Sequence, residues 1–461
     1  MKVTKEFLRE NKIKLVFFLL ASALYLSACA LLLVPEIQTL IIVYAEQSGL
    51  SNGKVVPPEI ISRFTTIGVA FYIFVLFLFA LEYFVINPRE KQTFNWELFF
   101  ILIITALGAA IRLTGFEYKT GDFFTQSDWV TYLRENGRLS AFRYFPGNYN
   151  AIYMYILAIL SYLPESMELY VMKAASCLFD YICAFAAMKI IGKITYNNKM
   201  GLLAYAVVLF SPTVFINSGL WAQSDSMHTA FILLSLYYLL DNRVKPALIL
   251  FGVGLSFKLQ AIFPLPFILY FFVSRKISLK NLLYIFVGFF SVSIPAWLIG
   301  WHPLAFVRNY MSGTNTLGNL TDNAPTIFTW GNIPAFMPVV FIIVVLFCVG
   351  ILIINKKSEL SNNTFLLLFL FCSFAVPFFL PRMHERYFYI GEIAVLLYSF
   401  ASPKRFWISI LVIAPALATY AGYLWGTNPV SLVFLSGVML AGVIVISKWL
   451  IESILTDSQM L

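Results

Sequence analysis

The chain has 461 residues, of which 60% are hydrophobic and 12% charged, and its mean hydropathy is +0.82. This composition excludes a globular domain with a single anchor and predicts a polytopic membrane protein. The net charge of +9 lies mainly in short loops, so we interpret it as setting membrane orientation and not as binding nucleic acid.

Successive apolar runs predict an all-α polytopic membrane protein with about 14 transmembrane helices, in a range of 12–14. The first run is too long for a cleaved signal peptide and lacks a small-residue cleavage site, so we expect it to be retained. The predicted spans are 13–34, 65–87, 96–113, 168–191, 201–217, 226–240, 246–260, 261–273, 281–299, 335–354, 363–380, 387–401, 406–424 and 430–449.

Short basic loops orient these spans. With the basic N-terminus in the cytoplasm, alternation places nearly every short basic loop on the same side, and both termini are then cytoplasmic. The loops 114–167 and 300–334 are then external. Segment 150–163 is too short to span comfortably and carries tyrosines, so we predict an interfacial helix there. Counting it as a span would move the basic loops outside.

We expect three parts along the chain. Residues 1–95 form an extra N-terminal transmembrane hairpin, and 96–300 form a core that carries the external loop 114–167. Residues 301–461 form a C-terminal transmembrane bundle with the external loop 300–334 and the polar segment 380–387.

The first external loop carries two aspartates in an aromatic setting, Asp122 and Asp128, beside Trp129. A carboxylate suits a general base acting on a sugar hydroxyl, and aromatic faces stack on sugar rings. The alternative is an ordinary hydrated loop in which Asp caps a helix that begins near Thr125. Both aspartates are therefore candidate bases.

Two further segments place polar residues between apolar helices. Segment 220–228 contains Trp221, Gln223 and Asp225, and its structural alternative is a turn in which Ser or Asp caps a helix. Lys258 and Gln260 lie between two short apolar stretches. Lys258 suits an outer-leaflet phosphate, and snorkelling to the surface is the alternative.

The segment Leu380–Tyr387 carries Arg382, His384, Glu385 and Arg386 at the end of an apolar run. A charge near the bilayer centre costs about 2.5–3.5 kcal/mol on the gentlest scale, so such groups indicate function. Forked guanidiniums hold a phosphate through paired hydrogen bonds. The alternative, a positive-inside anchor, disagrees with the predicted external position of this segment.

Three ionisable residues fall on predicted spans. Lys173 and Asp180 are two helical turns apart on one face, at a separation of about 10 Å, and we expect them to pair with other helices. Asp180 is expected to have a structural partner, with a catalytic role as the alternative. Arg112, at the end of its span, either orients the aspartates of the first loop or snorkels.

These motifs in this order resemble the GT-C superfamily of integral-membrane glycosyltransferases, over about 96–389. The similarity is to the bacterial branch like GPI mannosyltransferase II and, more distantly, to the glucosyltransferases that extend lipid-linked oligosaccharide. The resemblance implies a GT-C fold with interfacial helices in the first external loop. The first two predicted spans, 13–34 and 65–87, look like an addition before the usual start of the GT-C fold.

The resemblance assigns roles by position. Asp122 matches the catalytic base of the family, and Gln126 and Trp129 follow it at helical spacing. Trp221-Ala222-Gln223-Ser224-Asp225 is similar to Trp-Gly-Gln-x-Asp, with Ala222 in place of Gly. Tyr144 stands in an element similar to Asp-Tyr-Pro-Pro, but Arg143 replaces its Asp. The remaining matches are Lys258 and Gln260 in a Phe-Lys-x-Gln element, and His384, Glu385, Arg386 and Tyr387 in a Met-His-Glu-Arg-Tyr element near the donor phosphate.

Such enzymes use a polyprenyl-phosphate sugar as donor on the extracytoplasmic side. The implied reaction is inverting transfer of one sugar to a glycan or wall-polymer acceptor, with no cofactor and no metal. The five cysteines lie in apolar runs without ligand spacing, which also argues against zinc and disulfides. Composition suggests a bacterial plasma membrane and a cell-wall polysaccharide product.

Two alternatives stay open. A lipid-linked-sugar flippase or secondary transporter also has many spans, but it is expected to show inverted repeats and polar residues near the midplane. A polysaccharide polymerase or ligase also acts outside on lipid-linked sugars, but with a diphosphate-linked glycan as donor. The sugar, the acceptor, the linkage and the oligomeric state are not predicted.

Overall fold

The computed structural model describes residues 96–144, 147, 149–275, 277–315, 319–355 and 359–457, together with Thr39 and Val43. The chain divides into two compact units, 93–424 with 430–461, and 1–92 with 425–429. The fold and the site described below belong to the first unit. The predicted spans 13–34 and 65–87 lie outside the described residues.

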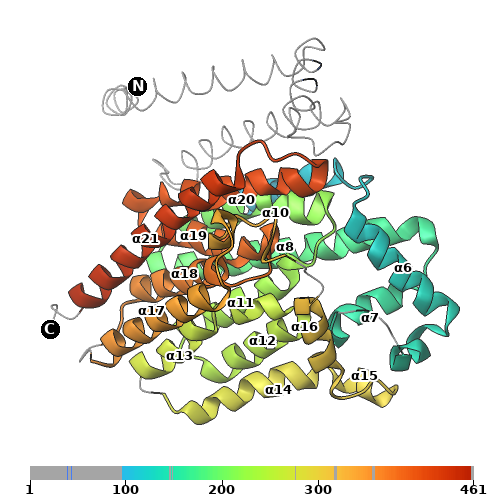
Figure 1. Cartoon of the computed structure of the whole chain (residues 1–461), viewed down its shortest axis with the longest axis horizontal. Helices are drawn as coiled ribbons and strands as arrows, with labels where there is room; N and C mark the ends of the chain where they lie inside the picture. Colours follow the sequence, from blue (N-terminus) through green and yellow to red (C-terminus); the bar gives the residue numbers. More distant parts are fainter. Residues whose placement is uncertain are drawn as a thin grey trace. The chain divides into compact units, whose positions relative to one another are not determined.

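The described residues are almost entirely helical, as predicted (Figure 1). The first half contains α5 (Trp96–Leu113), α6 (Gly121–Glu135), α7 (Ala151–Leu160), α8 (Glu165–Thr195), α9 (Asn198–Leu209), α10 (Pro212–Phe215), α11 (Asp225–Leu240), α12 (Val244–Phe257) and α13 (Leu265–Ser274). The second half contains α14 (Leu283–Ser291), α15 (Ile294–Leu298), α16 (Ala305–Asn315), α17 (Phe336–Ile354), α18 (Asn362–Phe379), α19 (Tyr389–Ala401), α20 (Ile408–Trp425) and α21 (Leu432–Thr456). Single turns lie between them at Arg138–Tyr144, Ile216–Leu220, Leu259–Ile262, Leu279–Leu282, Ile327–Trp330, Glu385–Phe388 and Pro403–Arg405.

Helices that lie close together in the chain also pack against one another. The long helix α8 contacts α9 and α11, α11 contacts α12, and α12 contacts α14 (Figure 1). The crossing of α12 and α14 is close because Gly252 and Gly288 face the opposite backbone. A Cβ at either position would lie 2.0 Å from a carbonyl oxygen of the other helix. Such small-residue contacts are common where membrane helices pack.

Only some of the predicted spans in the described part of the chain form helices that are long and apolar enough to cross a membrane. Among the described residues, five helices are long and apolar enough to cross a membrane, namely α8, α17, α18, α20 and α21. Counting the bent pair of α9 and Pro212–Leu220 as one span gives six. The predicted total of about 14 is not confirmed, since several of the predicted spans form shorter helices such as α12, α13 and α14.

Prolines explain two breaks that bear on the site. Predicted span 201–217 is broken because α9 ends at Leu209 and Pro212 starts a new helix, with a bend of 51°. α18 ends at Phe379 because Pro381 disfavours a helical conformation for Leu380, whose φ of −84° and ψ of 143° are extended. Each break precedes a polar segment that contributes to the site, 221–225 after the first and 380–387 after the second.

α6 and α7 pack together in the loop predicted to be external (Figure 1). α6 buries Phe123, Val130 and Leu133 in a cluster that also contains Leu157 of α7. α7 has ten residues, so it is short for a span, and it lies within the predicted interfacial segment 150–163. α6 and the residues Tyr149 and Asn150 just before α7 form one wall of the cavity described below.

A two-stranded parallel ladder joins two distant loops. β1 (Thr321–Asp322) pairs with β2 (Met383–His384), and Asp322 is opposite His384. The amide of Arg382 extends this contact by donating to the carbonyl of Leu320 at 2.6 Å. The loop 300–334 is thus fixed to the polar segment after α18.

Candidate active site

A cavity of about 720 Å³ lies where the predicted polar segments meet. One wall is the face of α6 that carries Asp122, Gln126 and Trp129. A second wall is cationic, with Lys258 after α12 and Arg382 and Arg386 after α18. Segments that are more than 250 residues apart in sequence therefore share one cavity. The rest of the lining includes the apolar side chains Phe257, Ile262, Phe263, Ala335 and Leu380.

The direction of Asp122 follows from the start of α6. Thr120 is the N-cap, and its hydroxyl accepts a hydrogen bond from the amide of Phe123 at 3.2 Å. The alternative in which Asp caps a helix near Thr125 is therefore wrong, because the helix begins at Gly121. Residues four and seven positions after Asp122 lie on the same helical face. Gln126 and Trp129 consequently line the cavity beside it.

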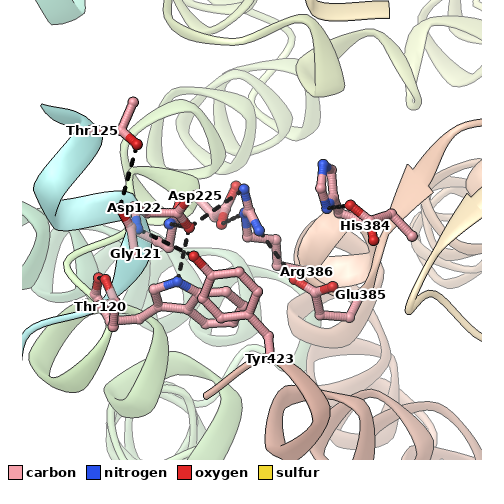
Figure 2. A network of polar contacts seen from close by, with 12 residues as sticks. Thr120, Gly121, Asp122, Thr125, Asp225, His384, Glu385, Arg386 and Tyr423 are labelled. Atoms are coloured by element: carbon pink, nitrogen blue, oxygen red, sulfur yellow. Dashed lines mark hydrogen bonds and ion pairs between the residues drawn. The ribbon is translucent and has the colours of Figure 1, made fainter. Parts of the chain in front are cut away.

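The Asp122 carboxylate accepts two side-chain hydrogen bonds. Trp221 Nε1 donates at 2.9 Å and Gln223 Nε2 at 2.5 Å, both to Oδ2. The amide of Asp122 donates to the hydroxyl of Tyr423 at 3.1 Å. Figure 2 shows Arg386 directed toward the same carboxylate, with 3.8 Å between its terminal nitrogen and Oδ2. The side chain of Asp122 keeps 29% of its surface exposed, so an entering hydroxyl can reach it.

The turn Ile216–Leu220 positions the donors to Asp122. Trp221 is fully buried, and its ring stacks on Tyr423 at 4.5 Å with an angle of 23°. Tyr420 approaches the same ring edge-on at 5.3 Å. After Trp221 the chain passes through Ala222 with a φ of 63°, a left-handed conformation that favours glycine. The Gly in the motif that this segment resembles is explained by that conformation.

We predict that position 222 tolerates glycine but not a β-branched residue. Ala222→Gly relieves a left-handed strain of about 1–2 kcal/mol and loses a similar amount through chain entropy and one buried methyl. Its unfolding free energy should stay within about 1 kcal/mol of wild type. Ala222→Val should cost more than about 2 kcal/mol. Thermal unfolding in lipid nanodiscs compares them, and equal stability of the two variants would contradict the strain.

Asp225 holds two cations at the cationic wall. Lys258 Nζ lies 2.5 Å from Asp225 Oδ1, and Arg386 Nε lies 3.8 Å from Oδ2. Asn217 donates to Oδ2 at 3.0 Å. Asp225 and Lys258 are 1% and 8% exposed, so water screens this pair weakly. Asp225 is thus a carboxylate that orients cations, and it does not line the cavity.

The segment after α18 contributes groups in different charge states. Arg386 donates to Glu385 Oε1 at 3.0 Å. Burial, together with the charges of Arg386 and Lys258, lowers the pKa of His384 to about 3. The imidazole is therefore neutral near pH 7, although its Nδ1 lies 3.2 Å from Asp322 Oδ2. The cationic part of this segment is Arg382 and Arg386.

Burial raises the pKa of Glu385 to about 7, against the opposing charge of Arg386. Between about pH 4.5 and 7 the unfolded chain loses this proton while the folded chain keeps it. The contribution of Glu385 to stability therefore falls as pH rises through this window. We predict that the thermal stability of Glu385→Gln, measured relative to wild type, increases as the pH rises from 5 to 7. Unfolding curves at several pH values measure this difference, and a constant difference would contradict the raised pKa.

The ionisable residues on the helices form a separate buried cluster. Arg112 Nε lies 2.8 Å from Asp180 Oδ2, and the other guanidinium nitrogens donate to the carbonyls of Gly108 and Leu209 at 2.9 Å. Ser218 also donates to Asp180. Arg112 is buried and therefore does not snorkel, and its guanidinium contacts Asp180 and not the loop aspartates. Lys173 donates to two carbonyls of the chain before α6, those of Gly115 and Tyr118.

Six predicted catalytic or substrate-binding residues do not line the cavity. Four of them lie behind it in contact with Asp122 or Arg386, namely Trp221, Gln223, Asp225 and Glu385. The other two lie away from it. Asp128 is exposed and does not line it, because six residues from Asp122 is most of the way to the other side of the helix. Tyr144 is 75% exposed and does not line it either, while the following Phe145 and Pro146 lie outside the described residues. Of the other predicted residues, Gln260 and Tyr387 line the cavity directly.

Sequence reasoning did not identify several residues that complete the site. Tyr423 contacts both Asp122 and Trp221, and Asn150 and Tyr310 line the cavity. Tyr423 lies inside an apolar helix, and Tyr310 lies in α16, within a segment predicted to be a long loop, so neither forms a local motif with the others. Among the described residues, no three His, Cys, Asp or Glu side chains gather closely enough to hold a metal ion.

Comparison with known proteins gives one partial match. The chain is 29% identical over 191 residues to GPI mannosyltransferase 1 of Candida albicans, an alignment that covers 37% of this chain and 44% of that protein. The chain thus matches less than half the length of the curated relative. No protein-family model matches the chain. The match is consistent with the resemblance to membrane glycosyltransferases, and it does not test the bacterial branch.

Proposed function

We propose that this protein is a membrane glycosyltransferase that moves one sugar from a polyprenyl-phosphate donor to an acceptor glycan or wall polymer. The observation that carries the proposal is the shared cavity, which brings Asp122 together with Lys258, Arg382 and Arg386. The partial similarity to GPI mannosyltransferase 1 supports the same class of reaction. It also makes mannose the first sugar to test.

In the proposed reaction, Asp122 takes the proton from an acceptor hydroxyl as that oxygen attacks the anomeric carbon. The bond from that carbon to the phosphate oxygen breaks, and the configuration inverts. Hydrogen bonds from Trp221 and Gln223 hold the carboxylate in place. Arg386 contacts Asp122 only at 3.8 Å, so an arriving phosphate can compete for the guanidinium and leave the base available.

The cationic wall would stabilise charge that grows on the leaving phosphate. Arg382, Arg386 and Lys258 supply this positive charge, and Asp225 fixes the direction of Lys258. His384 is neutral, so we assign it hydrogen bonding to the donor and not charge neutralisation. Side chains already bear this positive charge, so the proposed mechanism assigns no step to a metal or cofactor.

The apolar part of the lining suits a lipid chain. Ile262, Phe263 and Leu380 lie at the same cavity as the cationic wall, so a phosphate headgroup and the start of a polyprenyl chain can be held together. The predicted topology puts this cavity on the extracytoplasmic side of the plasma membrane, where nucleotide sugars are absent. The lipid-linked donor follows from that position.

A donor comparison tests the proposal. Purified protein in nanodiscs is given mannose on polyprenyl phosphate, a glycan on polyprenyl diphosphate, or GDP-mannose, each with a panel of methyl hexosides. Transfer from the monophosphate alone is expected. Transfer from the diphosphate alone would favour a polymerase or ligase. If no donor is used but labelled lipid crosses a liposome membrane, the flippase alternative replaces the proposal.

A further inference from the structure

Two amide side chains, those of Asn150 and Gln126, line the cavity that also contains Asp122, and their hydrogen bonds determine how each amide is oriented. Asn150, the N-cap of α7, is 1% exposed and lines the cavity. Its Nδ2 donates to the hydroxyl of Tyr310 at 2.9 Å, and that hydroxyl donates its only proton to the carbonyl of Leu255. Tyr310 must therefore accept from Asn150, which fixes the amide. Among the described residues, Asn150 Oδ1 has no hydrogen-bond donor.

Gln126 is fixed in the opposite sense. Its Oε1 accepts a hydrogen bond from the hydroxyl of Tyr153. Burial raises the pKa of Tyr153 well above its usual value, so this hydroxyl keeps its proton and donates. The Nε2 group of Gln126 is therefore turned away from Tyr153, and Gln126 lines the cavity. The cavity is thus lined by one oriented amide with an unused acceptor and by another with N–H groups to offer.

Aromatic rings lie beside these amides. Trp129 and Tyr149 both line the cavity, with their ring centres 5.7 Å apart, and Tyr149 lies 4.6 Å from Tyr153. Aromatic faces beside a few oriented polar groups are typical of carbohydrate subsites. The four side chains Gln126, Trp129, Tyr149 and Asn150 are uncharged, and this wall meets the cationic wall at Tyr149, whose ring centre lies 6.0 Å from Lys258 Nζ. The two walls therefore suit different chemical groups.

Distance along α6 relates this wall to the proposed base. At about 1.5 Å per residue, Gln126 lies about 6 Å and Trp129 about 10 Å along the helix from Asp122. A pyranose ring fits in that interval with one hydroxyl at Asp122. The sugar whose hydroxyl contacts the base is the acceptor.

We propose that Gln126, Trp129, Tyr149 and Asn150 form the subsite for the acceptor hexose. Asn150 Oδ1 accepts a hydrogen bond from one ring hydroxyl, and Gln126 Nε2 donates to another. This assignment rests on the proposed glycosyl transfer, because the choice of acceptor over donor depends on Asp122 as base. It makes Asn150 a residue that selects the acceptor by one hydroxyl.

Binding of methyl hexosides tests the subsite without turnover. Saturation-transfer NMR on the full-length protein in nanodiscs is run with the methyl glycosides of mannose, glucose, galactose and glucosamine. We expect Asn150→Ala to weaken the binding of the preferred glycoside about tenfold. Asn136→Ala is the matched control, since Asn136 is an exposed asparagine at the other end of α6 and should leave binding unchanged. Asn150→Asp, like Asn150→Ala, loses the donor to Tyr310, but it keeps an acceptor oxygen. It should therefore bind the glycoside better than Asn150→Ala, which separates the lost acceptor from a folding defect that both variants share.

Deoxy analogues identify the hydroxyl that Asn150 contacts. One monodeoxy glycoside should bind wild type as weakly as the parent binds Asn150→Ala, and the two losses should not add. Fully additive losses with every analogue, equal binding by Asn150→Ala and wild type, or no hexoside binding by wild type would each overturn the subsite.

Transfer kinetics separate this inference from the proposed function. Asn150→Ala should raise the acceptor KM about tenfold and leave the KM for polyprenyl-phosphate mannose within about twofold. A change confined to the donor KM would overturn the acceptor assignment. Glycoside binding with the expected pattern but without any transfer would support the hexose subsite and contradict the proposed glycosyltransferase activity.

Discussion

Replacing Asp122 with asparagine is expected to lower the rate of sugar transfer by about 10²–10⁴-fold, because the variant cannot accept the acceptor proton. Asparagine has nearly the same shape, and its carbonyl oxygen can still accept the hydrogen bonds from Trp221 and Gln223. The loss should therefore appear in kcat, with donor binding retained. Single-turnover transfer from polyprenyl-phosphate mannose, together with donor binding by the same sample, measures both quantities.

Asp128→Asn is the control for that experiment. Asp128 lies on the same helix, is exposed, and does not line the cavity, so its transfer rate should stay within about twofold of wild type. If Asp128→Asn abolished transfer and Asp122→Asn did not, the base would have to be reassigned to the residue that the structure places away from the cavity.

The second large effect concerns stability. Arg112→Met is expected to lower the free energy of unfolding by about 3–5 kcal/mol, because it leaves the carboxylate of Asp180 buried without its countercharge. Asp180 is 0% exposed, and its other contacts include the hydroxyls of Ser218 and Tyr389, which carry no positive charge. Chemical unfolding in mixed micelles measures the loss.

The double variant separates the ion pair from packing. Adding Asp180→Asn to Arg112→Met removes the unpaired charge, so it should recover at least about 1 kcal/mol of the loss. Asp180→Asn alone should cost less than Arg112→Met, since Arg112 keeps the carbonyls of Gly108 and Leu209. Additive losses in the double variant would mean that the two residues do not act as a pair.

The same pair bears on the site through the turn before Trp221. Ser218 of that turn donates to Asp180, and a Cβ on Gly219 would lie 3.0 Å from the Cα of Arg112. The buried pair therefore packs against the turn that places Trp221 at Asp122. Arg112 and Asp180 are positioning residues in this account, not groups that touch substrate.

Local motifs predicted much of this arrangement. The order of apolar runs predicted the helical class, and Asp122, Lys258 and Arg386 were identified from short polar segments between those runs. That these residues line one cavity could not be predicted from the sequence, because only the packing of the helices brings residues 122 and 386 together. Helix phase places Asp122 at the cavity and Asp128 away from it, and Asp122 is the residue that the resemblance had favoured over Asp128.

The parts that were missed depend on long-range contacts. The number of spanning helices was not confirmed because several predicted spans form shorter helices, such as α12 and α14, and two others lie outside the described residues. Tyr423 approaches Asp122 from α20, and no pattern near Tyr423 indicates this. His384 was grouped with the cations by residue type, but burial keeps it neutral.

The most direct test is whether new glycoside and free polyprenyl phosphate appear together. Purified protein in nanodiscs is given mannosyl polyprenyl phosphate and its preferred methyl hexoside, and both products are quantified with the anomeric configuration of the glycoside. The account predicts equal amounts of the two products and inversion at the anomeric carbon. Free lipid phosphate without new glycoside, or a product that retains the donor configuration, would contradict it.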